Sequence, residues 1–121
     1  MKTRFDPETL LPLPHVHFEI LVCLAHREQH GYALKREIGE RTEGRVQLGP
    51  GSLYGAIQKL IAAELIEESD RRPESHLDDE RRRYYRLTPE GRAVFKAETT
   101  RLRSLVELAE TRFGAPRARP A

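Results

Sequence analysis

One predicted helix has a face that combines small residues with side chains that can form hydrogen bonds. From residue 50 to about residue 63, apolar residues recur at helical spacing, and the opposite face presents Gly51, Ser52, Gly55, Gln58 and Lys59. A face this bare can approach the base edges in a DNA major groove, which present hydrogen-bond donors and acceptors. Glycine within a helix costs about 1 kcal/mol relative to alanine, which indicates a reason such as close approach for Gly55. We therefore expect Ser52 and Gln58 to contact bases and Lys59 to contact phosphate.

Two pairs of histidines have a spacing that could serve metal binding. His15 and His17 are two residues apart, and His26 and His30 are four apart. The helix that holds the first three should end near Arg27, which leaves His30 outside it, so solvated histidines are the simpler interpretation. We predict no metal site and no cofactor. The sequence has no nucleophile elbow, phosphate-binding glycine loop or zinc-hydrolase pair, so we expect no enzyme.

Composition indicates a small domain. The chain has 121 residues, and its single cysteine, Cys23, excludes an intrachain disulfide and suits a reducing compartment. Within an apolar helix Cys23 is expected to be a buried hydrophobe, with a redox-sensing role as the alternative. No apolar run approaches the ~20 residues of a membrane span, so we expect a cytoplasmic protein with no membrane partner. The net charge of only +2 is weak support for nucleic-acid binding, so such a hypothesis depends on where the lysines and arginines lie.

The spacing of apolar residues and the positions of prolines and glycines predict the helices and strands that would hold these residues in place. We predict an N-terminal arm over 1–13, a main domain over 14–87, a long last helix over 88–113 and a disordered tail over 114–121. The predicted elements of the main domain are helices over 14–27, 32–42 and 50–63, a short strand over 46–48, and strands over 65–69 and 82–87.

The last two strands should form a hairpin. Alternation places Tyr85 and Leu87 on one face and Tyr84 and Arg86 on the other. Residues 70–83 hold acids and arginines in equal number, so the connecting loop is expected to be solvated without forming a basic finger. Thr88 is then expected to cap the last helix, with Pro89 in its first turn.

Three motifs resemble those of one known family. Gly-Ser-Leu-Tyr at 51–54, His-Gly-Tyr-Ala-Leu at 30–34, and Tyr-Tyr-Arg-Leu-Thr-Pro-Glu-Gly at 84–91 are similar to motifs of the PadR family of bacterial transcriptional regulators, over roughly residues 15–110. The resemblance implies a mainly α fold with a small β-hairpin wing, a winged helix-turn-helix followed by a long C-terminal dimerisation helix. It also implies a double-stranded DNA partner. The expected DNA-binding residues are Tyr32, Lys35, Gly51, Ser52, Tyr54, Gly55, Gln58, Lys59, Arg82 and Arg83.

The resemblance further implies a homodimer. The helix over 14–27 is apolar on more than one face, and the last helix is longer than the domain it follows. The apolar faces of both helices therefore need a packing partner, which a second subunit would provide. The expected dimer interface consists of Phe18, Leu21, Phe95, Leu102, Leu105 and Ala109. Such a dimer would read a pseudo-palindromic operator, most simply as a repressor. Family members commonly respond to small aromatic effectors, although 7% aromatic residues and no tryptophan equip this chain poorly for stacking flat molecules.

Two other interpretations remain open at the level of sequence. The helix over 50–63 could be an ordinary core helix with small residues on its outer face. A winged helix can also serve as a protein–protein interaction module without sequence-specific DNA binding. Salt separates the DNA and protein alternatives, because DNA affinity falls steeply as salt rises.

Overall fold

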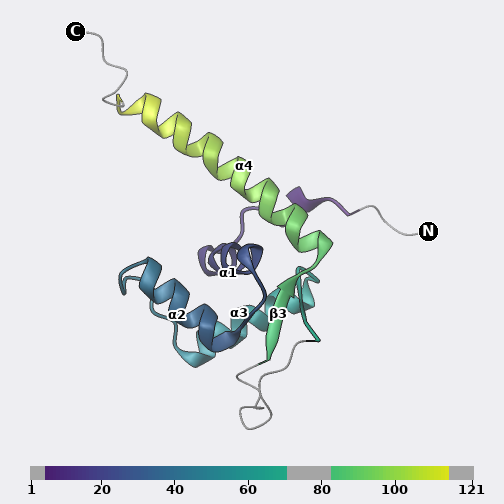
Figure 1. Ribbon diagram of the computed structural model, residues 1–121. Coiled ribbons are helices and arrows are strands. Elements are labelled where there is room, and N and C mark those ends of the chain that lie inside the picture. The colour runs from purple at the N-terminus through teal and green to yellow at the C-terminus, as the bar shows by residue number, and fades with distance from the viewer. Residues whose placement is uncertain (1–4, 71–82, 115–121) are drawn as a thin grey trace.

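The computed structural model describes residues 5–70 and 83–114 (Figure 1). A 3₁₀ helix, η1 (Pro7–Leu10), leads into four α-helices. The α-helices are α1 (His15–His26), α2 (Gly31–Arg41), α3 (Pro50–Ala62) and α4 (Pro89–Arg112). The predicted mainly α fold with a winged helix-turn-helix and a long last helix is therefore confirmed.

The predicted two-stranded hairpin is part of an antiparallel sheet of three strands, and the third strand was not predicted. Strands β2 (Ile66–Glu68) and β3 (Tyr84–Leu87) form the expected hairpin, with Ile66 opposite Leu87. On the other side of β3 lies β1 (Gln29–His30), which gives the order β1-β3-β2. Tyr85 and Leu87 are buried, whereas Tyr84 and Arg86 on the opposite face are partly exposed, which confirms the predicted alternation.

Residues 46–48 do not form the predicted strand. These residues form a loop in which Leu48 is buried in the core and Gln47 is exposed. The Val46 amide donates a hydrogen bond to Thr42 Oγ1 over 3.0 Å, and not to a neighbouring strand. The loop between β2 and β3, with Arg82 at its end, lies outside the described residues, as does the tail from residue 115.

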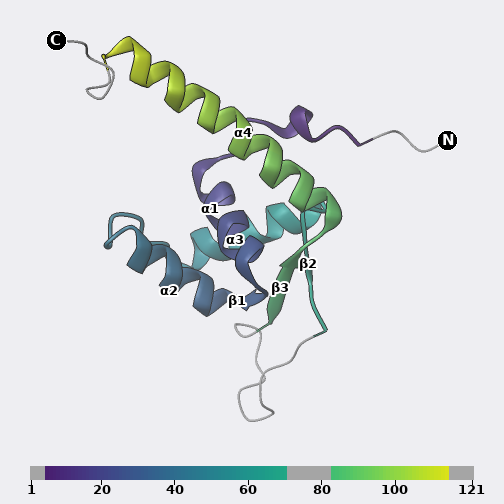
Figure 2. The same ribbon diagram turned by 45° about the horizontal axis from the view of Figure 1, so that its top comes forward.

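Helix α1 lies at the centre of the domain, between α4 on one side and α2 and α3 on the other (Figures 1 and 2). It contacts α2, α3, β3 and α4 of its own chain. This explains why α1 is apolar on several faces without needing a second subunit there. Leu21 has 0% of its surface exposed, so its predicted place at a dimer interface is wrong.

The residues from Thr88 to Gly91 join α4 to the end of α3. Thr88 caps α4, because its Oγ1 accepts a hydrogen bond from the Gly91 amide over 2.8 Å and donates one to the Glu64 carbonyl over 2.7 Å. The predicted cap is thus confirmed. Gly91 is buried so closely that a Cβ there would overlap the backbone carbonyl of Leu65. A bulkier residue would push the start of α4 away from the turn that follows α3.

The N-terminal segment packs along the first half of α4 through η1 and the residues after it. The Leu13 amide donates a hydrogen bond over 3.0 Å to Glu98 Oε2 on α4. Arg101 holds the same carboxylate through two hydrogen bonds of 2.6 and 3.1 Å. Glu98 is only 1% exposed, and the hydrogen bonds from Arg101 hold the pKa of this carboxyl below its usual range.

The second half of α4 projects away from the domain (Figures 1 and 2). Its side chains beyond Leu102 are exposed. Within the described residues, no helix is both long enough and apolar enough to cross a membrane.

Candidate nucleic-acid interface

Helix α3 buries one face and leaves the other almost bare. Leu53, Ile57 and Leu60 are each at most 1% exposed and anchor α3 to the core. On the opposite face Gly51 and Gly55 are exposed, and a Cβ at either position would meet no atom within 4 Å. The packing of the described chain therefore gives no steric reason for glycine at either position. The predicted residues Ser52, Gln58 and Lys59 are exposed on this helix as well.

Tyr54 lies on the flank of α3 that meets α2, and not on the bare face. Its ring covers Gly31, the first residue of α2, where a Cβ would come within 2.6 Å of the Tyr54 hydroxyl. Tyr54 is half-buried against the core. Its position explains why glycine begins α2 and indicates that Tyr54 orients the two helices of the helix-turn-helix.

Helix α2 presents two of the predicted contact residues next to the start of α3. Tyr32 is 49% exposed, and Lys35 is exposed one turn later. Both line a groove of about 540 Å³ that continues past Gln47 to Gly49, the residue that precedes α3. The structure thus brings Tyr32 and Lys35 to the same groove as the N-terminus of α3.

Unpaired cations lie on and around the helix-turn-helix. Among the described residues, Lys35, Arg45 and Lys59 have no acidic partner. Burial lowers the pKa of His17 on α1, and the nearby Lys59 ammonium lowers it further.

Both described arginines at the base of the wing are paired with acids. Arg83 pairs with Glu68 over 3.2 Å, and Arg86 pairs with Glu67 over 2.9 Å and with Glu28 over 3.8 Å. Because Arg83 already has an acidic partner, its guanidinium is less available to a phosphate than the sequence suggested. Arg82, the other predicted wing contact, lies outside the described residues.

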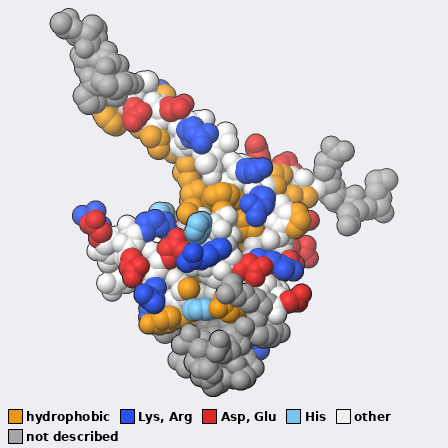
Figure 3. Space-filling view, viewed as in Figure 1, with side chains coloured by type: hydrophobic (Ala, Val, Ile, Leu, Met, Phe, Trp, Pro, Cys, Tyr) orange, Lys and Arg blue, Asp and Glu red, His pale blue; other side chains and the backbone are white. Residues whose placement is uncertain are grey.

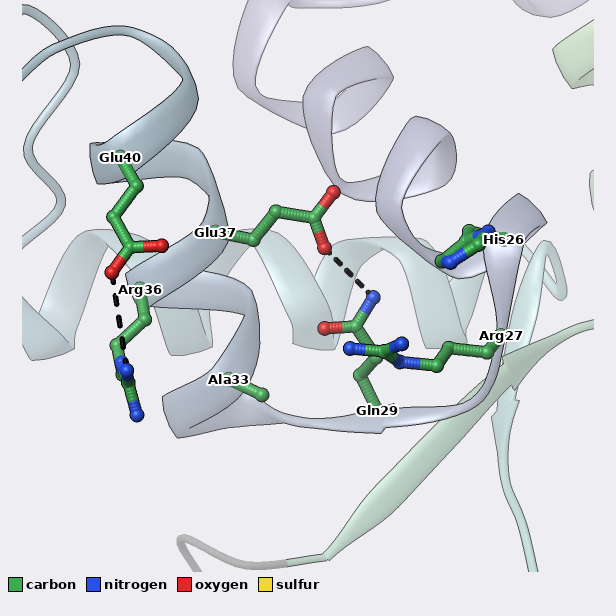
Figure 4. A pocket seen from close by; sticks show the side chains of 7 residues that line it. All are labelled: His26, Arg27, Gln29, Ala33, Arg36, Glu37 and Glu40. Carbon is green, nitrogen blue, oxygen red and sulfur yellow. Dashed lines mark hydrogen bonds and ion pairs between the residues drawn. The ribbon is translucent and has the colours of Figure 1, made fainter.

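A second hollow, of about 450 Å³, lies between the end of α1 and α2 (Figure 4). Its wall holds charges of both signs. Arg36 pairs with Glu40, and Gln29 donates a hydrogen bond to Glu37 over 3.0 Å (Figure 4). The mixed charges favour neither an anion nor a cation. No group of three potential metal ligands occurs in the described part of the chain.

Cys23 lies behind this hollow with 0% of its surface exposed. Burial, with a contribution from Glu37, raises the pKa of the thiol to about 12. Arg41 donates a hydrogen bond to the sulfur over 3.4 Å but does not reverse this shift. Because the thiolate is the reactive form, the structure favours the buried hydrophobe over the redox sensor for Cys23.

Apolar side chains continue along the projecting half of α4 (Figure 3). Leu105 is 52% exposed and Phe113 is 71% exposed, with Val106 and Leu108 exposed between them. Near the base of this stripe, Phe18 of α1 stacks on Phe95 of α4 with ring centroids 5.8 Å apart, and both are half-buried. The residues predicted for the dimer interface, apart from Leu21, are thus all at least partly accessible.

Comparisons with known proteins agree with this architecture. A family model described as "Transcriptional regulator PadR-like family" matches residues 20–97. The transcriptional regulator Rv3488 of Mycobacterium tuberculosis is 35% identical over 99 residues, which cover 82% of this chain and 83% of that protein. An uncharacterized 37.1 kDa protein in a transposon of Streptomyces fradiae is 38% identical over 79 residues, which cover 65% of this chain but only 20% of that protein.

Solved structures share the fold. A transcriptional regulator from Clostridium thermocellum superposes with a TM-score of 0.67 at 25% identity, covering 80% of this chain and 91% of that one. A PadR family transcription regulator from Clostridium difficile has a TM-score of 0.71 at 23% identity, covering 84% of this chain and 100% of that one. With the match of the family model, the helix-turn-helix and the wing, these comparisons establish that the chain belongs to the PadR-like family of transcriptional regulators.

Proposed function

We propose that this protein is a sequence-specific DNA-binding regulator that represses transcription in the cytoplasm by occupying an operator as a homodimer. The observation that carries the proposal is the bare face of α3. Gly51 and Gly55 are exposed and have open space above them, although alanine would stabilise the helix. Close approach to a DNA major groove gives a reason for glycine that the chain's own packing does not.

Each exposed side chain near this face has a separate task. Ser52 and Gln58 read base edges, because both carry hydrogen-bonding groups and Gln58 can bond to adenine through two groups at once. Tyr32, Lys35 and Lys59 contact phosphates and set the position of α3 in the groove. Arg45, unpaired and close to the start of α3, joins this set. Tyr54 acts indirectly, through its packing on Gly31.

The projecting half of α4 supports a second copy of the chain as partner. The residues of α4 that face the core, such as Val94, fall on the same helical stripe as Leu102, Leu105 and Ala109 farther along. The chain covers the first part of this stripe and leaves the second part exposed. A two-fold partner that packs its own α4 there would bury the stripe and present two copies of α3 to DNA.

Such a dimer places its two recognition helices on successive turns of one face of DNA, so the operator has two half-sites about one helical turn apart. A small effector, if one regulates the protein, binds between the α4 helices of the dimer. Screening phenolic acids and planar dyes for a shift in melting temperature tests this part, and no shift with any of them would count against a sensor role.

The alternative, a protein–protein interaction module, draws support from the arginines at the wing base, which are already paired with acids, and from the apolar stripe on α4. Salt separates the two functions. Operator binding should weaken by orders of magnitude between about 50 and 200 mM salt, whereas apolar docking should change little.

Two substitutions test the roles assigned within the interface. Gln58→Ala should cost about 1–3 kcal/mol on the matched duplex and relax specificity at one position of each half-site. Lys35→Ala should weaken binding to matched and mismatched duplexes alike and reduce the salt dependence by about one phosphate contact. Each variant is titrated against both duplexes at two salt concentrations. If both variants act as uniform weakeners, Gln58 does not read bases, and if neither changes affinity, α3 does not face DNA.

A further inference from the structure

Charged side chains follow the apolar stripe of α4 along one flank. At 3.6 residues per turn, five exposed residues fall within about 60° of one another around the helix: Arg92, Lys96, Arg103, Glu107 and Glu110. Their signs separate along the helix, because the bases come first and the acids follow. In Figure 3, acidic side chains border the apolar stripe near the far end of α4, and basic ones border it closer to the domain. We call these five residues the charged flank of α4.

The described part of the chain does not neutralise the charged flank. Its ion pairs involve none of the five side chains. Like charges are neighbours instead, since Arg92 and Lys96 are four residues apart and Glu107 and Glu110 are three apart. Side chains at these spacings face each other on a helix, so like charges repel. The two ends of the charged flank would therefore gain from a partner that brings the opposite sign to each.

The helix dipole also opposes this order of charges. The N-terminus of a helix favours acids and its C-terminus favours bases. Arg92 lies close to the N-terminus of α4, and Glu110 lies close to its C-terminus. The order of charges on the flank is thus unfavourable within the helix itself, which favours an explanation in a contact that α4 makes with another molecule.

A second copy of α4 that runs in the opposite direction carries the complementary order of charges. Arg92 and Glu110 lie equally far from Arg101 along the helix, on either side of it. Lys96 and Glu107 do so as well, to within one residue. A two-fold axis that crosses the helix pair near Arg101 would place each base of one copy beside an acid of the other. Because rotation about this axis keeps the same flank of both helices on the same side, the two charged flanks meet.

The apolar residues fit the same register. Phe95 and Val106 are also placed symmetrically about Arg101, to within one residue, so Val106 of one copy would lie against Phe95 of the other. Both side chains are accessible, because Val106 is 55% exposed and Phe95 is half-buried. Leu102, half-buried beside the axis, would meet its own counterpart. The register that pairs the charges therefore also covers apolar surface.

We propose that the second copy of the chain packs its α4 antiparallel to the first, in the register that pairs Arg92 with Glu110 and Lys96 with Glu107. The proposal rests on the homodimer of the proposed function and adds the direction and register of its interface. Exposed ion pairs contribute little affinity one by one. Their effect here is to select the antiparallel arrangement, because parallel helices would place Arg92 beside Arg92 and Glu110 beside Glu110.

Reversing the charges at one end of α4 tests the pairing. The base-reversed variant is Arg92→Glu/Lys96→Glu, and the acid-reversed variant is Glu107→Lys/Glu110→Lys. Each turns every proposed pair into two like charges, so the dissociation constant of the dimer should rise roughly tenfold or more in sedimentation measurements. The fourfold variant, which combines all four changes, restores opposite charges in every pair and should dimerise like the wild type.

Two controls separate the pairing from other effects. Arg27→Glu/Arg45→Glu changes the net charge as much as the base-reversed variant does, at exposed residues outside α4, and should leave the dimer unchanged. At 1 M salt the screening length falls to about 3 Å, so both reversed variants should regain most of the wild-type affinity. A damaged fold would not recover with salt.

The outcomes keep the proposal apart from the proposed function. A wild type that stays monomeric at micromolar concentration would contradict the homodimer itself, and the pairing with it. If the wild type is a dimer and neither reversal weakens it, the homodimer stands and the antiparallel register is wrong, since a parallel pair of helices faces like charges before and after either change. A fourfold variant that remains as weak a dimer as the reversed variants would overturn the register as well.

Discussion

Replacing Gly55 by alanine should move the stability of the protein and its affinity for DNA in opposite directions. Gly55 lies in the interior of α3, where a Cβ would meet no atom of the described chain within 4 Å. The methyl group therefore fits the free protein, and alanine gains about 0.5–1 kcal/mol from its lower backbone entropy in the unfolded state. For a chain of this length, the melting temperature should rise by about 2–5 °C.

The same methyl group would stand between α3 and a DNA surface that approaches it closely. We expect Gly55→Ala to lose about 1–3 kcal/mol of operator affinity, the range typical of one base contact, because α3 must retreat or tilt in the groove. Thermal unfolding and duplex titration on the same preparations measure the two effects. Gly39→Ala in α2 is the control for the gain in stability alone, because a Cβ there also meets nothing within 4 Å but Gly39 lines the same groove as Tyr32 and Lys35.

Only one outcome refutes this reasoning fully. If Gly55→Ala is more stable and binds its operator as tightly as the wild type, no DNA surface comes close to Gly55, and the bare face of α3 is not the recognition surface. If the variant is less stable, the open space above Gly55 is filled in solution by some part of the protein itself.

Three further predictions follow from particular contacts. Gly91→Ala should destabilise the fold by roughly 1–3 kcal/mol or more in denaturant unfolding, because its methyl group would overlap the Leu65 carbonyl, and an unchanged midpoint would contradict this packing. Cys23, with a pKa raised to about 12, should resist alkylation at pH 8 until the protein unfolds, and rapid labelling of native protein would contradict its burial. Leu105→Glu should shift the protein toward monomer in light scattering, whereas Ser104→Glu, also exposed on α4 but off the apolar stripe, should not. A Leu105→Glu protein that remains a dimer would place the interface elsewhere.

Much of the fold follows from local sequence signals. The four helices begin and end near their predicted residues because Pro50, Thr88 and Pro89 mark starts that the backbone can adopt in few other ways. The faces of β3 follow from the alternation of buried and exposed residues. The exposed face of α3 was predicted for the same reason, since its apolar positions fix which side is buried.

The features that sequence did not reveal are set by contacts between distant residues. β1 has two residues of ordinary composition and becomes a strand only by pairing with β3. Leu21 looks like an interface residue until α1 is seen to be surrounded by its own chain. The role of Tyr54 against Gly31 and the cap provided by His30 likewise depend on where α2, α3 and β3 meet.

Selection of bound duplexes from a random DNA pool, repeated at two salt concentrations, tests the central claim most directly. The account predicts enrichment of one sequence with two half-sites related by a two-fold axis, centred about one helical turn apart, whose binding weakens steeply as salt rises. Gln58→Ala should relax the preference at one position in each half-site of that sequence. A pool that remains random after repeated selection, or retention that does not change with salt, would contradict sequence-specific DNA binding by α3.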